Sequence, residues 1–230
     1  MSATKSETDR LRALVSPEGI PYADYDARGL ALALPVGAAS TVLLAGLRAT
    51  TTESLDHRKV RIPANAILYM FHRDIELAIF APAFWDALGS DFAYLGFHGF
   101  ASYVGVVWPW LRGYRAFRYA RGGSPKKPME QVLDYLLANP HERFALRTDA
   151  GKPYGVVRAS LVDFSLATGR PLVAVRQVAD RSTQLAGHYF PLPGATIESR
   201  VSAPVYPDDL RSLTREAARD RLQNVIDALA

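Results

Sequence analysis

A histidine and a glutamate four residues apart, His72 and Glu76, form the pair in this chain best suited to acid–base chemistry. His72 follows the apolar run AILYMF, which is typical of a short buried strand, and a helical pattern begins after it. Side chains at positions i and i+4 share a helix face, so the carboxylate can contact the imidazole. That contact would fix the tautomer and leave the other ring nitrogen as a general base. A purely structural histidine at a helix start is the alternative.

Asp74 lies between these two residues and faces another side of the same helix. We expect it to cap the helix or to form a local salt bridge, and it is a secondary candidate for the site. His98 is a second secondary candidate, because it also follows an apolar run. Its aromatic neighbours Phe97, Phe100 and Tyr103 favour a histidine in the core or in a pocket wall.

Two basic, glycine-containing turns could bind an anion. The first follows a strand and offers guanidinium forks and exposed backbone amides, and the second leads into a helix N-terminus. It is not a P-loop, because Gly-x4-Gly-Lys-Ser/Thr is absent. Ordinary basic surface loops are the alternative in both places. The candidate binding residues are Arg118, Arg121, Gly122 and Ser124 in the first turn, and Asp149, Gly151 and Lys152 in the second.

Short apolar runs alternate with longer helical patterns along most of the chain, which favours an α/β fold. We expect a central mixed, mostly parallel sheet with helices on both faces. Sites in such sheets lie at the carboxyl ends of the strands, where these candidates fall. The expected strands are 66–71, 91–97, 115–120, 143–148, 171–178 and 196–203, and the expected helices 73–88, 100–111, 125–138, 154–168 and 208–229.

The chain of 230 residues is expected to form one domain, 1–230, without a linker. Segment 1–27 is polar and does not have the pattern of a secretory signal. Segment 28–50 is expected to form an apolar helix, because residues 29–47 carry no charge. Its length approaches the ~20 residues of a membrane span, but Pro35 and internal glycines favour a helix buried against the domain or lying on a membrane. Segment 208–229 is expected to form an amphipathic helix.

Composition excludes several functions. The chain has no cysteine, so a disulfide framework, a thiol nucleophile and cysteine-bound metals are excluded. The 5 histidines lack the spacing of a zinc site, and we expect no metal. The net charge of +4 is only weak support for nucleic acid as a partner, since the arginines are scattered. It suits an anionic membrane surface or a phosphorylated substrate equally well.

The order of several short motifs resembles that of the lysophospholipid acyltransferase-like superfamily, and within it the bacterial domain-of-unknown-function 374 branch. The motifs are Phe71-His72, then Arg121-Gly122-Gly123-Ser124, then Thr148-Asp149-Ala150-Gly151-Lys152-Pro153, and finally Thr168-Gly169-Arg170-Pro171 before a strand. The resemblance covers about residues 47–205, most of the chain.

The resemblance implies transfer of a fatty acyl group from a thioester to a hydroxyl of a phosphorylated lipid or glycolipid acceptor. His72 would be the general base, and the Arg121 block would contact the acceptor phosphate. It implies no tightly held cofactor, with acyl-CoA or an acyl carrier protein thioester as the donor substrate. The expected location is peripheral, on the cytoplasmic face of the bacterial inner membrane. The Trp108-Pro109-Trp110 segment and the 28–50 helix would contact the lipid.

One departure from the superfamily pattern keeps a second function open. The superfamily signature is His-x4-Asp or His-x4-Glu, whereas Leu77 stands five residues after His72 and Tyr103 five after His98. Glu76 is one position short of the signature, although helical spacing still allows the contact. The alternative is therefore a catalytically silent protein that binds lipids or anions on the same fold.

Overall fold

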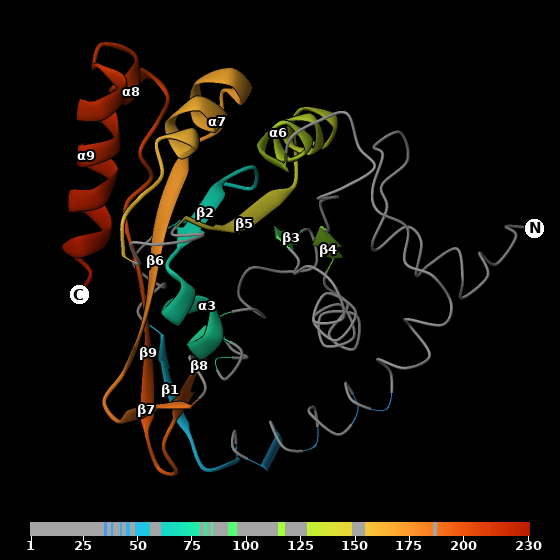
Figure 1. Ribbon diagram of the computed structural model, residues 1–230, viewed down its shortest axis with the longest axis vertical. Coiled ribbons are helices and arrows are strands. Elements are labelled where there is room, and N and C mark those ends of the chain that lie inside the picture. Colours follow the sequence, from blue (N-terminus) through green and yellow to red (C-terminus); the bar gives the residue numbers. More distant parts are fainter. Residues whose placement is uncertain are drawn as a thin grey trace, which may run out of the picture.

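The computed structural model describes residues 35, 38, 42, 45–46, 49–55, 61–78, 81, 84, 92–95, 115–117, 128–148, 155–185 and 188–230. Within them, a sheet of seven strands has the order β1-β9-β6-β2-β5-β3-β4 (Figure 1). The strands are β1 (Thr52–Leu55), β2 (Ile67–Met70), β3 (Phe92–Leu95), β4 (Arg115–Phe117), β5 (Arg143–Arg147), β6 (Leu172–Ala179) and β9 (Thr196–Val201).

The strands from β6 to β4 in this order are mutually parallel. At the other side β9 pairs antiparallel with β6, and β1 pairs parallel with β9 and ends the sheet. All four residues of β2 are buried, as is typical of a central parallel strand covered on both faces. The predicted mixed, mostly parallel sheet is therefore confirmed.

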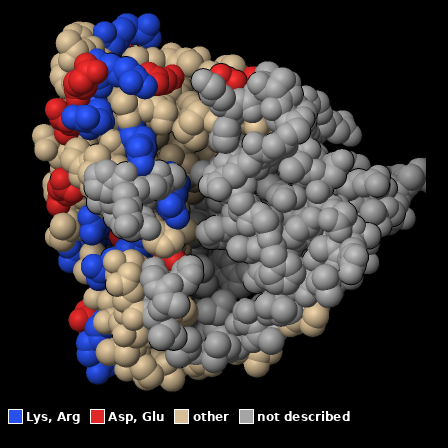
Figure 2. Space-filling model, viewed as in Figure 1, with Lys and Arg blue, Asp and Glu red and all other residues tan. Residues whose placement is uncertain are grey.

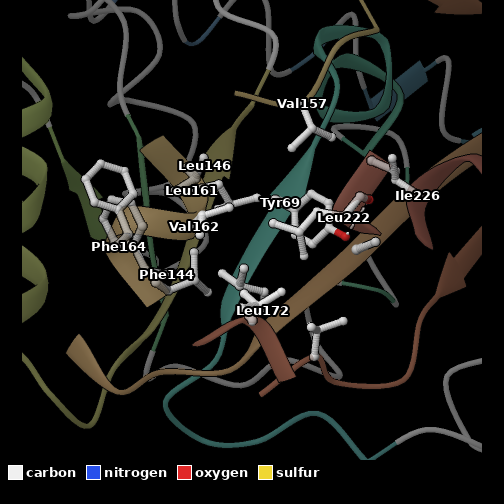
Figure 3. Close-up of a cluster of buried hydrophobic side chains, with 14 of the residues drawn as sticks. Tyr69, Phe144, Leu146, Val157, Leu161, Val162, Phe164, Leu172, Leu222 and Ile226 are labelled. Carbon is white, nitrogen blue, oxygen red and sulfur yellow. Dashed lines mark hydrogen bonds between the residues drawn. The ribbon is translucent and has the colours of Figure 1, made fainter. Parts of the chain in front are cut away.

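Helices cover both faces of this sheet. One face packs against α6 (Pro128–Ala138), α7 (Ser160–Thr168), α8 (Asp208–Arg211) and α9 (Arg215–Asp227), as Figure 3 shows for part of the core. There the Tyr69 hydroxyl donates to the Leu222 carbonyl of α9 at 3.0 Å, and burial raises the pKa of Tyr69. The other face packs against α3 (His72–Ala78). Side-chain alternation along β2 separates the two cores, with Tyr69 in one and Leu68 in the other.

A buried arginine closes the amino end of the central strands. Arg170 is 1% exposed, and its guanidinium donates to three backbone carbonyls: Asn65 before β2, Leu136 in α6 and Glu142 before β5. Burial lowers the pKa of Arg170 to about 10, so the group is charged at neutral pH. Arg170, from the Thr-Gly-Arg-Pro segment, therefore has a structural role, and it lies at the opposite end of β2 from His72. Gly169 before it is the C-cap of α7 and has a φ of 69°, a left-handed conformation that glycine adopts without strain.

Three predicted helices are wrong in extent. The helix expected at 73–88 is not continuous, because α3 is His72–Ala78 and Ala81 is not helical. The helix expected at 154–168 begins at Ser160, because Gly155 has a φ of 78° and the Val157 amide donates to Gln223 Oε1 at 2.8 Å instead of to a helical carbonyl. The helix expected at 208–229 is divided into α8 and α9. Thr214 starts the second of them, and its hydroxyl accepts from the Ala217 amide at 3.2 Å.

The hairpin of β7 (Ser182–Leu185) and β8 (His188–Pro191), together with β1, was absent from the sequence prediction. The hairpin lies between β6 and β9 along the chain, and β8 packs against α3. Its residues are mainly polar and aromatic, so they lack the apolar run that marked the central strands. It brings Tyr189 and Phe190 to the core beneath α3.

The expected apolar helix at 28–50 lies largely outside the described residues. Its described helical residues are exposed, Val42 by 73%; they are Pro35, Ala38, Val42, Ala45, Gly46 and Ala49. In the described part of the chain, no helix combines the length and apolar character needed to cross a membrane. The segment 1–27 also lies outside the described residues.

Candidate functional site

The candidate site begins where β2 ends and α3 starts. The Phe71 amide donates to Asp74 Oδ2 at 3.2 Å, so the third residue of α3 reaches back to the residue that precedes the helix. This is one half of a capping box, and it holds the first turn in place. Asp74 therefore caps the helix, as expected, and His72 is fixed as the first helical residue at the carboxyl end of a central strand.

Glu76 and His72 contact each other as the helical spacing predicted. His72 Nε2 lies 2.9 Å from Glu76 Oε1, and the two side chains are 18% and 11% exposed. The second carboxylate oxygen, Oε2, accepts from the Tyr189 amide of β8 at 2.8 Å. The hairpin therefore fixes the carboxylate on one side, and the carboxylate in turn orients the imidazole.

Arg147 contacts the other ring nitrogen of His72, Nδ1. Its Nη1 lies 2.8 Å from His72 Nδ1, because the parallel register places Arg147 of β5 opposite Met70 of β2. A guanidinium only donates hydrogen bonds, so Nδ1 accepts and the ring proton resides on Nε2, where it faces Glu76. The expectation of a second nitrogen left open by Glu76 is therefore wrong for this arrangement. Arg147 is not among the candidate residues predicted from the sequence, so this contact was not foreseen.

Asp74 also forms a buried ion pair on the far side of the helix start. Its Oδ1 accepts from the Gln177 amide at 3.2 Å and lies 3.2 Å from Arg176 Nε, which is not aligned for a hydrogen bond. The Arg176 guanidinium stacks 5.2 Å from the centre of the Phe71 ring. Burial raises the pKa of Asp74 to about 6, although Arg176 and the two amides oppose that rise. One carboxylate thus joins the start of α3 to β6.

The raised pKa of Asp74 predicts that stability falls as pH rises from about 4 to about 6. In that window the unfolded chain has lost the proton that the folded protein still holds, so deprotonation is linked to unfolding. The whole effect is about 3 kcal/mol, from a shift of about 2 pH units. We expect Asp74→Asn to remove this slope, as measured by denaturant unfolding at a series of pH values.

Other carboxylates titrate in the same range, but they do so in both proteins, so the difference between the two curves isolates Asp74. Equal slopes for the wild type and Asp74→Asn would show that Asp74 titrates normally in the folded state.

The remaining candidates lie outside the described residues. They are Arg118, Arg121, Gly122, Ser124, Asp149, Gly151, Lys152 and His98. Whether the two basic turns approach His72 therefore stays a prediction. Thr148, just before the second turn, is buried, and its hydroxyl accepts from the Arg158 amide at 3.1 Å. In the described part, no three His, Asp or Glu side chains gather as metal ligands.

A shallow groove lies elsewhere, along the exposed side of α9. Its charged members Asp220 and Arg221 are exposed, and it contains no histidine. We assign no chemistry to it, because the polar contacts with catalytic potential are those of His72. Figure 2 shows basic side chains distributed over the described part of one face, with acidic side chains among them.

Comparison with protein-family models found no family that matches this chain, and comparison with curated proteins found no matching sequence.

Proposed function

We propose that this protein transfers a fatty acyl group from an acyl thioester to a hydroxyl of a phosphorylated lipid or glycolipid acceptor. The observation that carries the proposal is the 2.9 Å contact between His72 and Glu76 at the carboxyl end of β2. A histidine oriented by a carboxylate is the arrangement that general-base catalysis uses. The resemblance to the lysophospholipid acyltransferase-like superfamily, and to its domain-of-unknown-function 374 branch, supplies the substrate class.

In the proposed reaction, the acceptor hydroxyl gives its proton to His72 Nδ1 as its oxygen forms a bond to the thioester carbonyl carbon. Glu76 stabilises the imidazolium that results, through the hydrogen bond at Nε2. When the tetrahedral intermediate collapses, the carbon–sulfur bond breaks and the thiolate takes the proton back from Nδ1. The products are an ester and a thiol, and His72 returns to its neutral form.

The binding partners belong to the proposal as well. Arg118, Arg121, Gly122 and Ser124, with Asp149, Gly151 and Lys152, are the proposed contacts for the acceptor phosphate. The donor is acyl-CoA or an acyl carrier protein thioester, without a tightly held cofactor or a metal. The apolar segment 28–50 and Trp108-Pro109-Trp110 would attach the protein peripherally to the cytoplasmic face of a bacterial inner membrane.

One experiment tests both parts. The purified protein is incubated with a labelled acyl thioester of each donor class and with vesicles that contain one lysolipid acceptor at a time. We expect label in a phosphorylated lipid product, together with sedimentation of the protein with the vesicles and its release by carbonate. Absence of product with every donor and acceptor contradicts acyl transfer, whereas retention through carbonate contradicts peripheral attachment.

A second candidate is a catalytically silent protein that binds lipids or anions. The observation in its favour is that both ring nitrogens of His72 are engaged, Nε2 by Glu76 and Nδ1 by Arg147. In the same assay this candidate predicts sedimentation with anionic vesicles and no transfer of label from either donor.

A further inference from the structure

The position of Arg147 has a consequence for the proposed base. His72 Nδ1 is the nitrogen that must accept the hydroxyl proton, and Arg147 Nη1 donates to that atom at 2.8 Å. A hydroxyl cannot form the same hydrogen bond until the guanidinium leaves. In this arrangement His72 and Glu76 are in contact, but Arg147 blocks the Nδ1 atom of His72.

The charges near His72 favour an anion as the ligand that draws Arg147 away from Nδ1. With His72 neutral, three guanidinium groups and two carboxylates of the described residues lie at this edge, which leaves a surplus of one positive charge among them. Of the two carboxylates, Glu76 is fixed by the imidazole and by the Tyr189 amide, and Asp74 by two amides and an arginine. The three arginines are Arg73 of α3, Arg147 of β5 and Arg176 of β6.

A phosphate is a better partner for Arg147 than a neutral imidazole. The guanidinium fork can form two parallel hydrogen bonds to phosphate oxygens, both assisted by opposite charges, whereas it forms one to Nδ1. The other two arginines already have local partners. Arg176 lies beside Asp74, and the Arg73 guanidinium lies 5.6 Å from the centre of the Tyr189 ring. Arg147 is the described arginine that contacts the base, and a phosphate can take the place of the imidazole at its Nη1.

We propose that Arg147 binds the phosphate of the acceptor and thereby frees His72 Nδ1 to act as the base. The inference rests on the proposed function and deepens it, since it names the residue that couples binding of a phosphorylated ligand to the availability of the base. The shared ligand chemistry is a phosphate group, whether it belongs to a lipid headgroup or to free inorganic phosphate.

The first test needs no variant. In protein carrying ¹⁵N-labelled histidine, long-range ¹H–¹⁵N spectra show which ring nitrogen holds the proton. Without added phosphate, we expect His72 to be the tautomer protonated at Nε2. A His72 protonated at Nδ1 would overturn the proposal, because Arg147 could not then donate to that nitrogen.

The second test titrates three ligands into the same protein: inorganic phosphate, a short-chain lysophosphatidate and an uncharged monoacylglycerol. We expect a saturable shift of the His72 Nδ1 resonance with the two phosphates and none with the uncharged lipid. Saturation by inorganic phosphate alone would identify free phosphate as the ligand, and saturation by the lysophosphatidate alone would identify a lipid headgroup. Saturation by the uncharged lipid would overturn the proposal.

Variants then assign the effect to Arg147. Arg147→Gln should weaken phosphate binding about tenfold or more, since a charge-assisted hydrogen bond is lost, and Arg147→Lys should restore part of it. Arg211→Gln on α8 is the matched control, because that side chain is exposed and pairs with the nearby, exposed Asp208. Equal binding by the wild type and Arg147→Gln, with both proteins folded by circular dichroism, would remove Arg147 from the phosphate site.

The titrations measure binding and the acyl-transfer assay measures turnover, so the two proposals can fail separately. Phosphate binding through Arg147 without acyl transfer would contradict the proposed function and leave the anion site intact. Acyl transfer that is unchanged in Arg147→Gln would contradict the coupling and leave the proposed function intact.

Discussion

Replacing His72 by alanine should lower the rate of acyl transfer by about 10²–10⁴-fold, the range typical of a lost general base. The imidazole is partly exposed and lies in the first turn of α3, so its removal leaves both hydrophobic cores intact. The free energy of unfolding should therefore change little. The measurement is the initial rate with a saturating thioester donor, beside a denaturant unfolding curve.

His141 provides the matched control for this variant. It is an exposed histidine in the turn between α6 and β5, and His141→Ala should keep full activity. Glu76→Gln should be slower than the wild type, because the amide keeps the contact but cannot stabilise an imidazolium with a negative charge. Unchanged transfer in His72→Ala would remove His72 from the mechanism and direct attention to His98.

Replacing Arg170 by methionine should destabilise the protein by about 3–5 kcal/mol, which is a large share of the ~5–15 kcal/mol that stabilises a typical domain. Methionine fills much of the same space but leaves the carbonyls of Asn65, Leu136 and Glu142 without their donor. One of these carbonyls lies before β2, one lies in the last turn of α6 and one lies before β5. Loss of the guanidinium therefore affects three elements together. The measurement is the midpoint of denaturant unfolding. An unchanged m-value will show that a shift in the midpoint reports a change in stability.

Arg211→Met serves as the control, since Arg211 is 69% exposed and pairs with an exposed aspartate. Its effect should stay within about 0.5 kcal/mol. A shift for Arg170→Met no larger than that of this surface variant would mean that the buried guanidinium is replaceable by apolar packing, as some buried charges are.

The contact between His72 and Glu76 was predictable because it depends only on helical spacing. The contact with Arg147 depends instead on strand order, since it joins two residues 75 apart in the sequence and forms only because β2 pairs with β5. No periodicity in the sequence reports which strands are neighbours. The Tyr189 amide was unpredictable for a related reason: a backbone donor has no sequence signature, and its hairpin was not recognised.

The same distinction holds for the fold. β2, β5 and β6 were predictable because central parallel strands are apolar on both faces, which leaves a continuous signal. The break between α8 and α9 was missed because Leu210 and Ala217 are seven residues apart and so fit one face of a continuous helix. Thr214 was the available signal, since threonine followed by a glutamate within the first turn is a typical helix start.

Among the described strands, β1 lies at the end of the sheet opposite β4, and its sequence bears on how this protein behaves at high concentration. β1 has only four residues, TESL, and three of them are polar. Glu53 in its middle accepts from the Phe84 amide at 2.8 Å, so a charged side chain sits within the edge strand. Short edge strands with an embedded charge are poor templates for pairing with strands of other chains. We therefore expect β1 to resist aggregation by the addition of strands from other chains.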